Sequence, residues 1–131
     1  MSIGLQEAFD ALFIAPFATH RWESERARSH WVDLECWQDS IAGPVSSIVE
    51  TGGCEYVYAR DDWYFAEVND PESLRAKLSE WLMGLSAGVE RFKPTSPHED
   101  ADLQFMRDVT SRMEQLIEQA CAIERSRWSN K

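Results

Sequence analysis

Residues 45–68, VSSIVETGGCEYVYARDDWYFAEV, carry the strongest strand signal in the chain. Val, Ile, Tyr, Trp and Phe dominate its segments 45–50, 54–60 and 63–68, and these residue types favour β-strands. Thr51-Gly52-Gly53 and Asp61-Asp62 separate the segments, and short breaks of this composition suit hairpin turns. The stretch therefore predicts an antiparallel meander.

The two turns also predict which side chains share a face of this sheet, because opposed residues on paired strands point the same way. One face would carry the small and aliphatic set Ile48, Val57, Ala59, Tyr64, Ala66 and Val68. The other would carry the large aromatic set Val49, Tyr56, Tyr58, Arg60, Trp63, Phe65 and Glu67. A helix suits the first face, and the aromatic face is either covered by another segment or partly exposed as a binding patch.

Upstream of this stretch, the apolar pattern of residues 31–37 fits both the two-residue period of a strand and the 3.6-residue period of a helix. Apolar and acidic residues alternate from Val32 to Cys36, as in a half-buried strand. A helix ending at Gly43-Pro44 fits equally well, with an apolar face made by Ala27, Trp31, Leu34 and Ile41. We favour the strand, which gives a meander of three to four strands over about residues 31–68.

Three helices are expected around the meander. Residues 3–14 have an apolar helical face, and Pro16 stops the pattern. Asp70-Pro71-Glu72 predicts the start of a second helix, over about residues 71–92, because Asp can cap free N–H groups and Pro tolerates the first helical position. Ser96-Pro97-His98-Glu99 predicts a capping box for a third, over about residues 97–127. The sequence thus predicts a single α+β domain spanning residues 1–131.

The third helix carries a narrow apolar seam, because its apolar residues recur every three or four positions: Met106, Val109, Met113, Leu116, Ala120 and Ile123. Such a seam usually belongs to the core of its own domain. The alternative is that the seam contacts a partner helix or forms a homodimer through the C-terminal helix.

The acidic residues are concentrated in the middle third of the chain. The net charge is −10 over 131 residues, and residues 31–72 contain ten acids opposed by Arg60 alone. Nucleic acid and anionic membranes are unfavourable partners for such a chain, because they are bound through Lys and Arg. A basic protein surface is the natural complement.

The predicted aromatic face lies inside this acidic region, and Tyr and Trp are frequent binding hot spots. The acids would steer a basic partner toward the surface, while the aromatic side chains would hold it. We therefore expect the partner-binding residues to be Tyr56, Tyr58, Asp61, Asp62, Trp63 and Glu67.

No motif of known catalytic chemistry stands out. The phosphate loop, the G-x-S-x-G elbow, the dinucleotide fingerprint and the H-E-x-x-H helix are all absent from the sequence. His20 with Glu23, and His30 with Asp33, have a three-residue spacing that can place two metal ligands together on a helix. We expect these four to be solvated surface residues, and predict no catalytic residue, metal or cofactor.

The cysteines and the N-terminus favour a cytoplasmic location. The three cysteines are odd in number and lack a paired spacing, so we expect Cys36, Cys54 and Cys121 to be reduced. A signal peptide would require a basic residue near its start, but no basic residue precedes Arg21. No apolar run approaches the roughly 20 residues that span a bilayer.

These features together predict an acidic protein-binding module that neutralises or escorts a basic partner protein, as an immunity protein or antitoxin does. A chaperone or adaptor for a secreted, type III-like effector would share its small size and acidity. A small metal-dependent enzyme, with ligands among His20, Glu23, His30 and Asp33, is the alternative from a different class.

Overall fold

The computed structural model describes residues 2–10, 20–54 and 68–129. None of these residues is in a strand, and their helices are α1 (Ser2–Phe9), α3 (Glu25–Asp33), α4 (Glu35–Thr51), α6 (Pro71–Glu90) and α7 (Pro97–Ser129). The described part of the chain is therefore all-α, and the predicted α+β fold is wrong. The strands predicted at 31–37 and 45–50 are helical, while those at 54–60 and 63–68 fall almost wholly outside the described residues.

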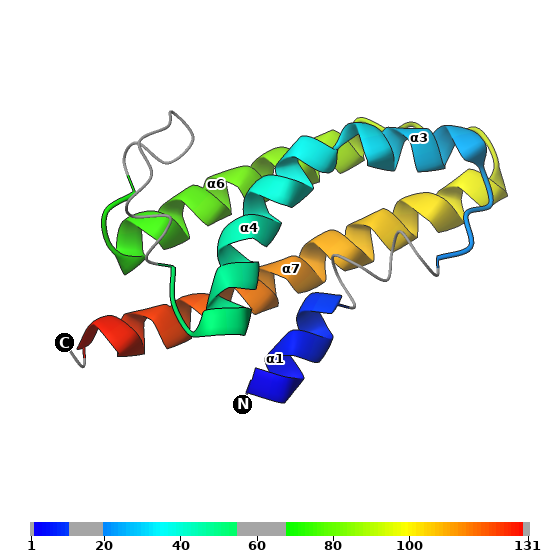
Figure 1. The fold of residues 1–131 in the computed structure, drawn as a ribbon. Coiled ribbons are helices and arrows are strands. Elements are labelled where there is room, and N and C mark those ends of the chain that lie inside the picture. The colour runs from blue at the N-terminus through cyan, green and yellow to red at the C-terminus, as the bar shows by residue number, and fades with distance from the viewer. Residues whose placement is uncertain (1, 11–19, 55–67, 130–131) are drawn as a thin grey trace.

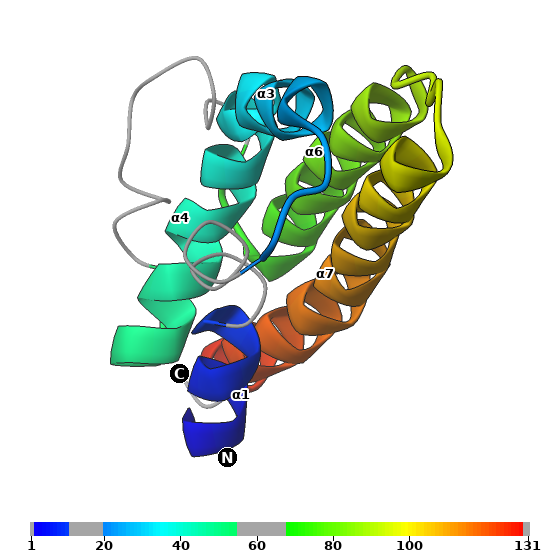
Figure 2. The same ribbon diagram turned by 90° about the vertical axis from the view of Figure 1, so that its right-hand side faces the viewer.

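The helices form a hairpin with a second helical layer beside it. α6 and α7 run antiparallel along the length of the molecule, joined by residues 91–96 (Figure 1). α3 and α4 follow one another along α6, with only Leu34 between them, and both also contact α7 (Figure 2). α1 packs against α4 and α7.

The two long helices begin where the sequence predicts. The Asp70 carboxylate accepts a hydrogen bond from the Ser73 N–H at 2.7 Å, and the Ser73 hydroxyl accepts from the Asp70 N–H at 3.1 Å, with Pro71 in the first turn. The Ser96 hydroxyl accepts from the Glu99 N–H at 3.2 Å and caps α7. The predicted helices at about 71–92 and 97–127 are confirmed as α6 and α7.

The region from residue 25 to residue 51 follows the helical alternative that the sequence also allowed. Its predicted apolar face, Ala27, Trp31, Leu34 and Ile41, is buried, whereas Val32 is 40% exposed. Cys36, which a half-buried strand would have turned inward, is also exposed. Burial against α6 and α7 overrides the strand preference of the β-branched residues here.

α4 also runs through Gly43-Pro44 instead of ending there. Proline has no N–H to donate to the carbonyl four residues earlier, which here is that of Ser40, and this loss bends helices. α4 changes direction along its length (Figure 1). It ends at Gly52, whose φ of +80° is accessible to glycine at little cost.

Two glycines of α6 allow the second layer to approach closely. A Cβ atom at Gly84 would lie 2.6 Å from the Trp37 ring, and one at Gly88 would lie 2.5 Å from a Leu34 methyl carbon. Both distances are too short for a real contact. Gly84 and Gly88 therefore mark where α3 and α4 rest on α6.

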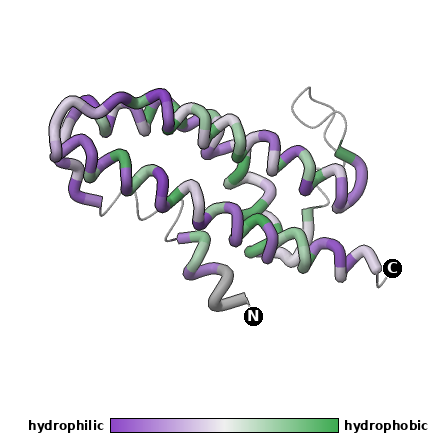
Figure 3. Tube along the Cα trace, turned by 180° about the vertical axis from the view of Figure 1, so that it is seen from behind, coloured by the Kyte–Doolittle hydropathy of each residue, from purple (hydrophilic) through white to green (hydrophobic). Residues whose placement is uncertain are grey.

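The apolar seam of α7 is used by the domain itself. Met106, Val109, Met113, Leu116 and Ala120 are all buried in the core, and only Ile123 at the end of the seam is 37% exposed. Hydrophobic and hydrophilic positions alternate along α6 and α7 (Figure 3). Within the described ranges, no helix combines the length and apolar character needed to cross a membrane.

All three cysteines are free, and two of them are buried. The Cys54 thiol donates to the Pro44 carbonyl at 3.0 Å. Burial, followed by the nearby Glu124 carboxylate, raises the pKa of Cys54 to about 12. Burial likewise raises the pKa of Cys121 to about 11. Both thiols are therefore protonated packing groups at neutral pH.

Candidate partner-binding surface

The partner-binding residues predicted from the sequence all belong to one segment. Tyr56, Tyr58, Asp61, Asp62, Trp63 and Glu67 lie outside the residues that the structure describes. The predicted assignment of side chains to two faces of a sheet is wrong for Ile48 and Val49, because both residues are on helix α4. The acidic character of the middle third can still be followed in the described residues on either side.

α3 and α4 carry an exposed acidic surface, which we call the acidic face: Asp33, Glu35, Asp39 and Glu50. Glu35, Asp39 and Glu50 lie on the side of α4 opposite its buried residues Ile41, Val45 and Ile48. No Lys or Arg occurs from residue 29 to residue 54. Among the described residues, none of the four carboxylates has an ion pair or a hydrogen bond.

The acids of the α6–α7 hairpin are arranged differently, because three of them pair with a base on the other helix. Glu72 accepts from Arg125 at 2.9 Å, and Glu90 accepts from Arg107 at 2.6 and 2.7 Å. Glu118 accepts from Arg75. The Arg107 hydrogen bonds hold the pKa of Glu90 below its ordinary value. These pairs compensate part of the hairpin's negative charge, whereas none of the four acids of the acidic face is compensated by a described base.

Two buried acids of α7 hold the start of α3. The Asp102 side chain is 1% exposed and accepts from the N–H groups of Glu23 at 3.1 Å and Ser24 at 2.9 Å. Glu99 accepts from the Arg26 guanidinium at 2.5 Å and from the Ser24 hydroxyl at 2.7 Å. These bonds join residues more than 70 positions apart and hold the first turn of α3 against α7.

The sequence prediction missed this role of Glu99 and Asp102. The capping box assigned to Glu99 is only half formed, because its carboxylate accepts from the Thr95 N–H at 2.9 Å as well as from α3. A signal for both residues existed in the spacing. Residues 99, 102, 106, 109 and 113 share one helical face, so these two acids continue the apolar seam. Acids on a buried seam must be paired or hydrogen-bonded.

The histidines do not form the metal site that their spacing allowed. His20 stacks on Phe105 with ring centroids 3.5 Å apart, and its Nε2 lies 3.5 Å from the Asp102 carboxylate. His30 instead contacts the Gly88 carbonyl at 2.8 Å. No group of three or more His, Cys, Asp or Glu side chains in the described segments is arranged to hold a metal ion.

Replacing Glu99 with glutamine should flatten the acid side of the stability profile. The Arg26 hydrogen bonds, followed by those of Ser24 and Thr95, hold the pKa of Glu99 far below its ordinary value of 4.5. The folded-state pKa is therefore below the unfolded one. The stabilisation that the ionised Glu99 gains from these hydrogen bonds is present above about pH 4.5 and is lost as the pH falls below that value.

Urea unfolding between pH 2.5 and 7 would measure this effect. We expect Glu99→Gln to be less stable than wild type at pH 7, with the difference shrinking toward pH 2.5. Asp100→Asn is the matched control, because Asp100 is the exposed neighbouring acid. A constant difference between Glu99→Gln and wild type over the whole range would contradict the assignment.

Comparison of the chain with protein-family models, with curated proteins and with solved structures finds no match.

Proposed function

We propose that this protein is a binding module for a basic protein and that the acidic face of α3 and α4 meets the partner. One observation carries the proposal: the four acids of this face lack counter-ions among the described residues, while three acids of the hairpin pair with a base on the other helix. Unpaired surface charge of one sign creates a field that extends into solvent and attracts the opposite charge.

The rigidity of the acidic face supports this role. α3 is anchored to α7 through Asp102 and Glu99, and Gly84 and Gly88 let Trp37 and Leu34 seat on α6. A preorganised charged surface loses little conformational entropy on binding. Val32 and Cys36 are exposed beside these acids and offer apolar contact to a docked partner.

A protein of this kind would act as an inhibitor that covers a basic surface, in the manner of an immunity protein or antitoxin. An acidic cover neutralises the Lys and Arg side chains through which a basic protein binds its own anionic target. The acidic face thus attracts the basic partner and covers its surface, and it catalyses no reaction.

Neutralising the acidic face should slow association with the partner about tenfold at low salt and weaken the salt dependence, with little effect on dissociation. The test variant is the triple Asp33→Asn, Glu35→Gln, Asp39→Asn. The partner would be isolated with the wild-type protein as bait, and both rate constants measured by surface plasmon resonance at several salt concentrations.

The matched control changes the net charge equally but elsewhere: Glu80→Gln, Asp100→Asn and Asp108→Asn, all exposed on α6 and α7. We expect this control to bind nearly as the wild type does. Equal rates for the acidic-face triple and wild type, with both variants folded by circular dichroism, would sink the proposal.

A further inference from the structure

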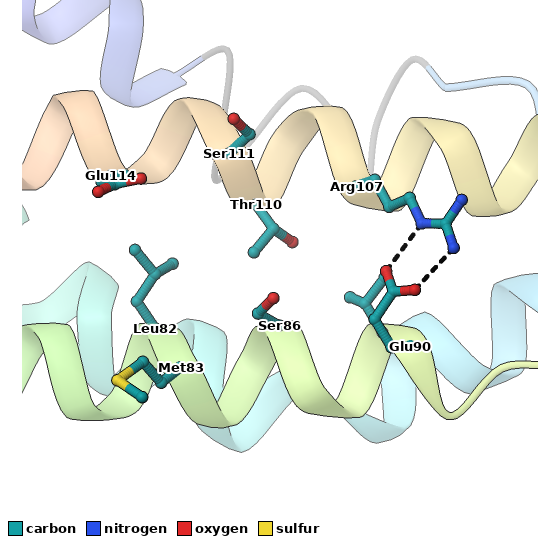
Figure 4. Close-up of a pocket in the computed structure, with 9 residues that line it drawn as sticks. Leu82, Met83, Ser86, Glu90, Arg107, Thr110, Ser111 and Glu114 are labelled. Carbon is teal, nitrogen blue, oxygen red and sulfur yellow. Dashed lines mark hydrogen bonds and ion pairs between the residues drawn. The ribbon is translucent and has the colours of Figure 1, made fainter.

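A groove of about 390 Å³ runs between α6 and α7 on the hairpin (Figure 4). No residue of α3 or α4 lines it, and these helices lie behind the hairpin in this view, so the groove is separate from the acidic face. Its walls include Leu82, Met83 and Ser86 from α6 and Thr110, Ser111 and Glu114 from α7.

The groove exists because short side chains face one another at this level of the hairpin. Ser86 of α6 and Thr110 of α7 point toward one another across the space between the helices, and neither side chain is long enough to fill it (Figure 4). The Thr110 hydroxyl is already used, donating to the Met106 carbonyl at 2.8 Å. What remains for an occupant is largely apolar surface, including the half-buried Leu82 and the buried Val89.

The two ends of the groove differ in charge. At one end Arg107 donates two hydrogen bonds to Glu90, at 2.7 and 2.6 Å, and the pair is neutral (Figure 4). At the other end Glu114 is exposed and has no ion pair or hydrogen bond with the described residues. An occupant would therefore meet one uncompensated negative charge.

Met83 lies at the same end as Glu114 and is 73% exposed (Figure 4). Methionine is unbranched and polarisable, so it adapts to varied apolar partners. The stem of a lysine could pack along Met83 while its ammonium group reaches Glu114, since long basic side chains combine an apolar stem with a charged end.

We propose that this groove receives an amphipathic helical segment of a partner protein, with apolar side chains over Ser86 and Thr110 and a Lys or Arg on Glu114. Residues 107–114 of α7 cover about 10 Å, or two helical turns, at the usual rise of 1.5 Å per residue. That length admits two apolar anchors four residues apart, with the basic residue one turn beyond, which is the helix-in-groove mode of recognition.

The probe is a synthetic 15-residue helical peptide with two Leu four residues apart and one Lys a turn later, on an Ala and Gln background. Titration into ¹⁵N-labelled protein should shift amide signals of residues 82–90 and 107–114 in a saturable way. Two control peptides, one with Lys→Glu and one with both Leu→Ser, should bind roughly tenfold more weakly or not at all.

Variants of the protein locate the site. Glu114→Lys should weaken peptide binding roughly tenfold, whereas Asp108→Lys makes the same charge change on the outer surface of α7 and should not. Ser86→Leu fills the groove at an exposed position and should abolish binding. Met83→Ala is a second variant that does not depend on the folding of Ser86→Leu. It removes no core contact and should also weaken binding.

Several outcomes would overturn this inference. One is the absence of saturable shifts, and another is shifts confined to α3 and α4. Equal binding of the Lys→Glu peptide would remove the role of Glu114. Binding of octyl glucoside in the groove without binding of the peptide would make it a small-molecule site. The Asp33, Glu35 and Asp39 triple should keep its affinity for the peptide, so failure of the proposed function would remain distinguishable.

Discussion

Replacing Trp31 with alanine should lower the free energy of unfolding by about 3–5 kcal/mol, the usual cost of truncating a buried Trp. Trp31 is 1% exposed, and its ring lies 6.5 Å from that of Phe105 on α7. The cavity left by the indole would lie between α3 and α7, where close packing prevents easy collapse. Urea unfolding followed by circular dichroism at 222 nm would measure the change.

The neighbouring Val32→Ala is the matched control for this prediction. Val32 is 40% exposed, so its truncation should change stability by no more than about 0.5 kcal/mol. The two variants separate the helix from the strand that residues 31–37 also suggested, because the strand turns Val32 inward. A larger loss for Val32→Ala than for Trp31→Ala would contradict the helical assignment.

Trp31→Phe adds a finer test of the same site. The indole N–H is buried and has no hydrogen-bond partner among the described residues. Phenylalanine keeps most of the ring and removes this unsatisfied donor, whose burial costs free energy. We expect Trp31→Phe to cost well under half of the loss caused by Trp31→Ala.

Replacing Asp102 with alanine should cost about 3 kcal/mol of stability, because each buried donor left without a partner costs about 1–3 kcal/mol. The change leaves the N–H groups of Glu23 and Ser24 without an acceptor, because in the wild type both donate hydrogen bonds to the Asp102 carboxylate, at 3.1 and 2.9 Å. It also leaves His20 without the carboxylate that lies 3.5 Å from its Nε2. Asp102→Asn should lose less, because one oxygen acceptor remains.

The control for Asp102 is Asp108→Ala on the same helix. Asp108 is exposed and accepts a hydrogen bond from the Gln104 side chain at 2.9 Å. We expect a change within about 0.5 kcal/mol. Hydrogen exchange should further show faster amide exchange in residues 23–33 of Asp102→Ala, because α3 loses its anchor. Equal stabilities of the Asp102 and Asp108 variants would argue against an anchoring role.

The candidate surface was predictable only in its sign of charge. The run of acids without a base, from residue 29 to residue 54, is visible in the sequence and survives as the acidic face. The particular residues proposed, Tyr56 to Glu67, depended on a sheet and its register, and they lie outside the described residues. The contribution of α4 to the surface came from the structure, which turns Glu35, Asp39 and Glu50 outward.

The sequence by itself determined where α6 and α7 begin and which face of α7 is apolar. Those signals are local: Asp70 bonds to Ser73, Ser96 bonds to Glu99, and the seam repeats within a few residues. Capping and periodicity act over one or two turns and need no distant partner.

Only the tertiary structure decided that residues 25–51 are helical and which of their side chains are buried. From Val32 to Cys36 the sequence fits both the strand period and the helical period, and the β-branched residues after Pro44 favour a strand. The balance is set by segments far along the chain: Gly84 and Gly88 admit Trp37 and Leu34, and Asp102 holds Ser24. Burial against such partners outweighs local preference, because each buried large side chain contributes about 1.5–3 kcal/mol and propensity differences are below about 1 kcal/mol.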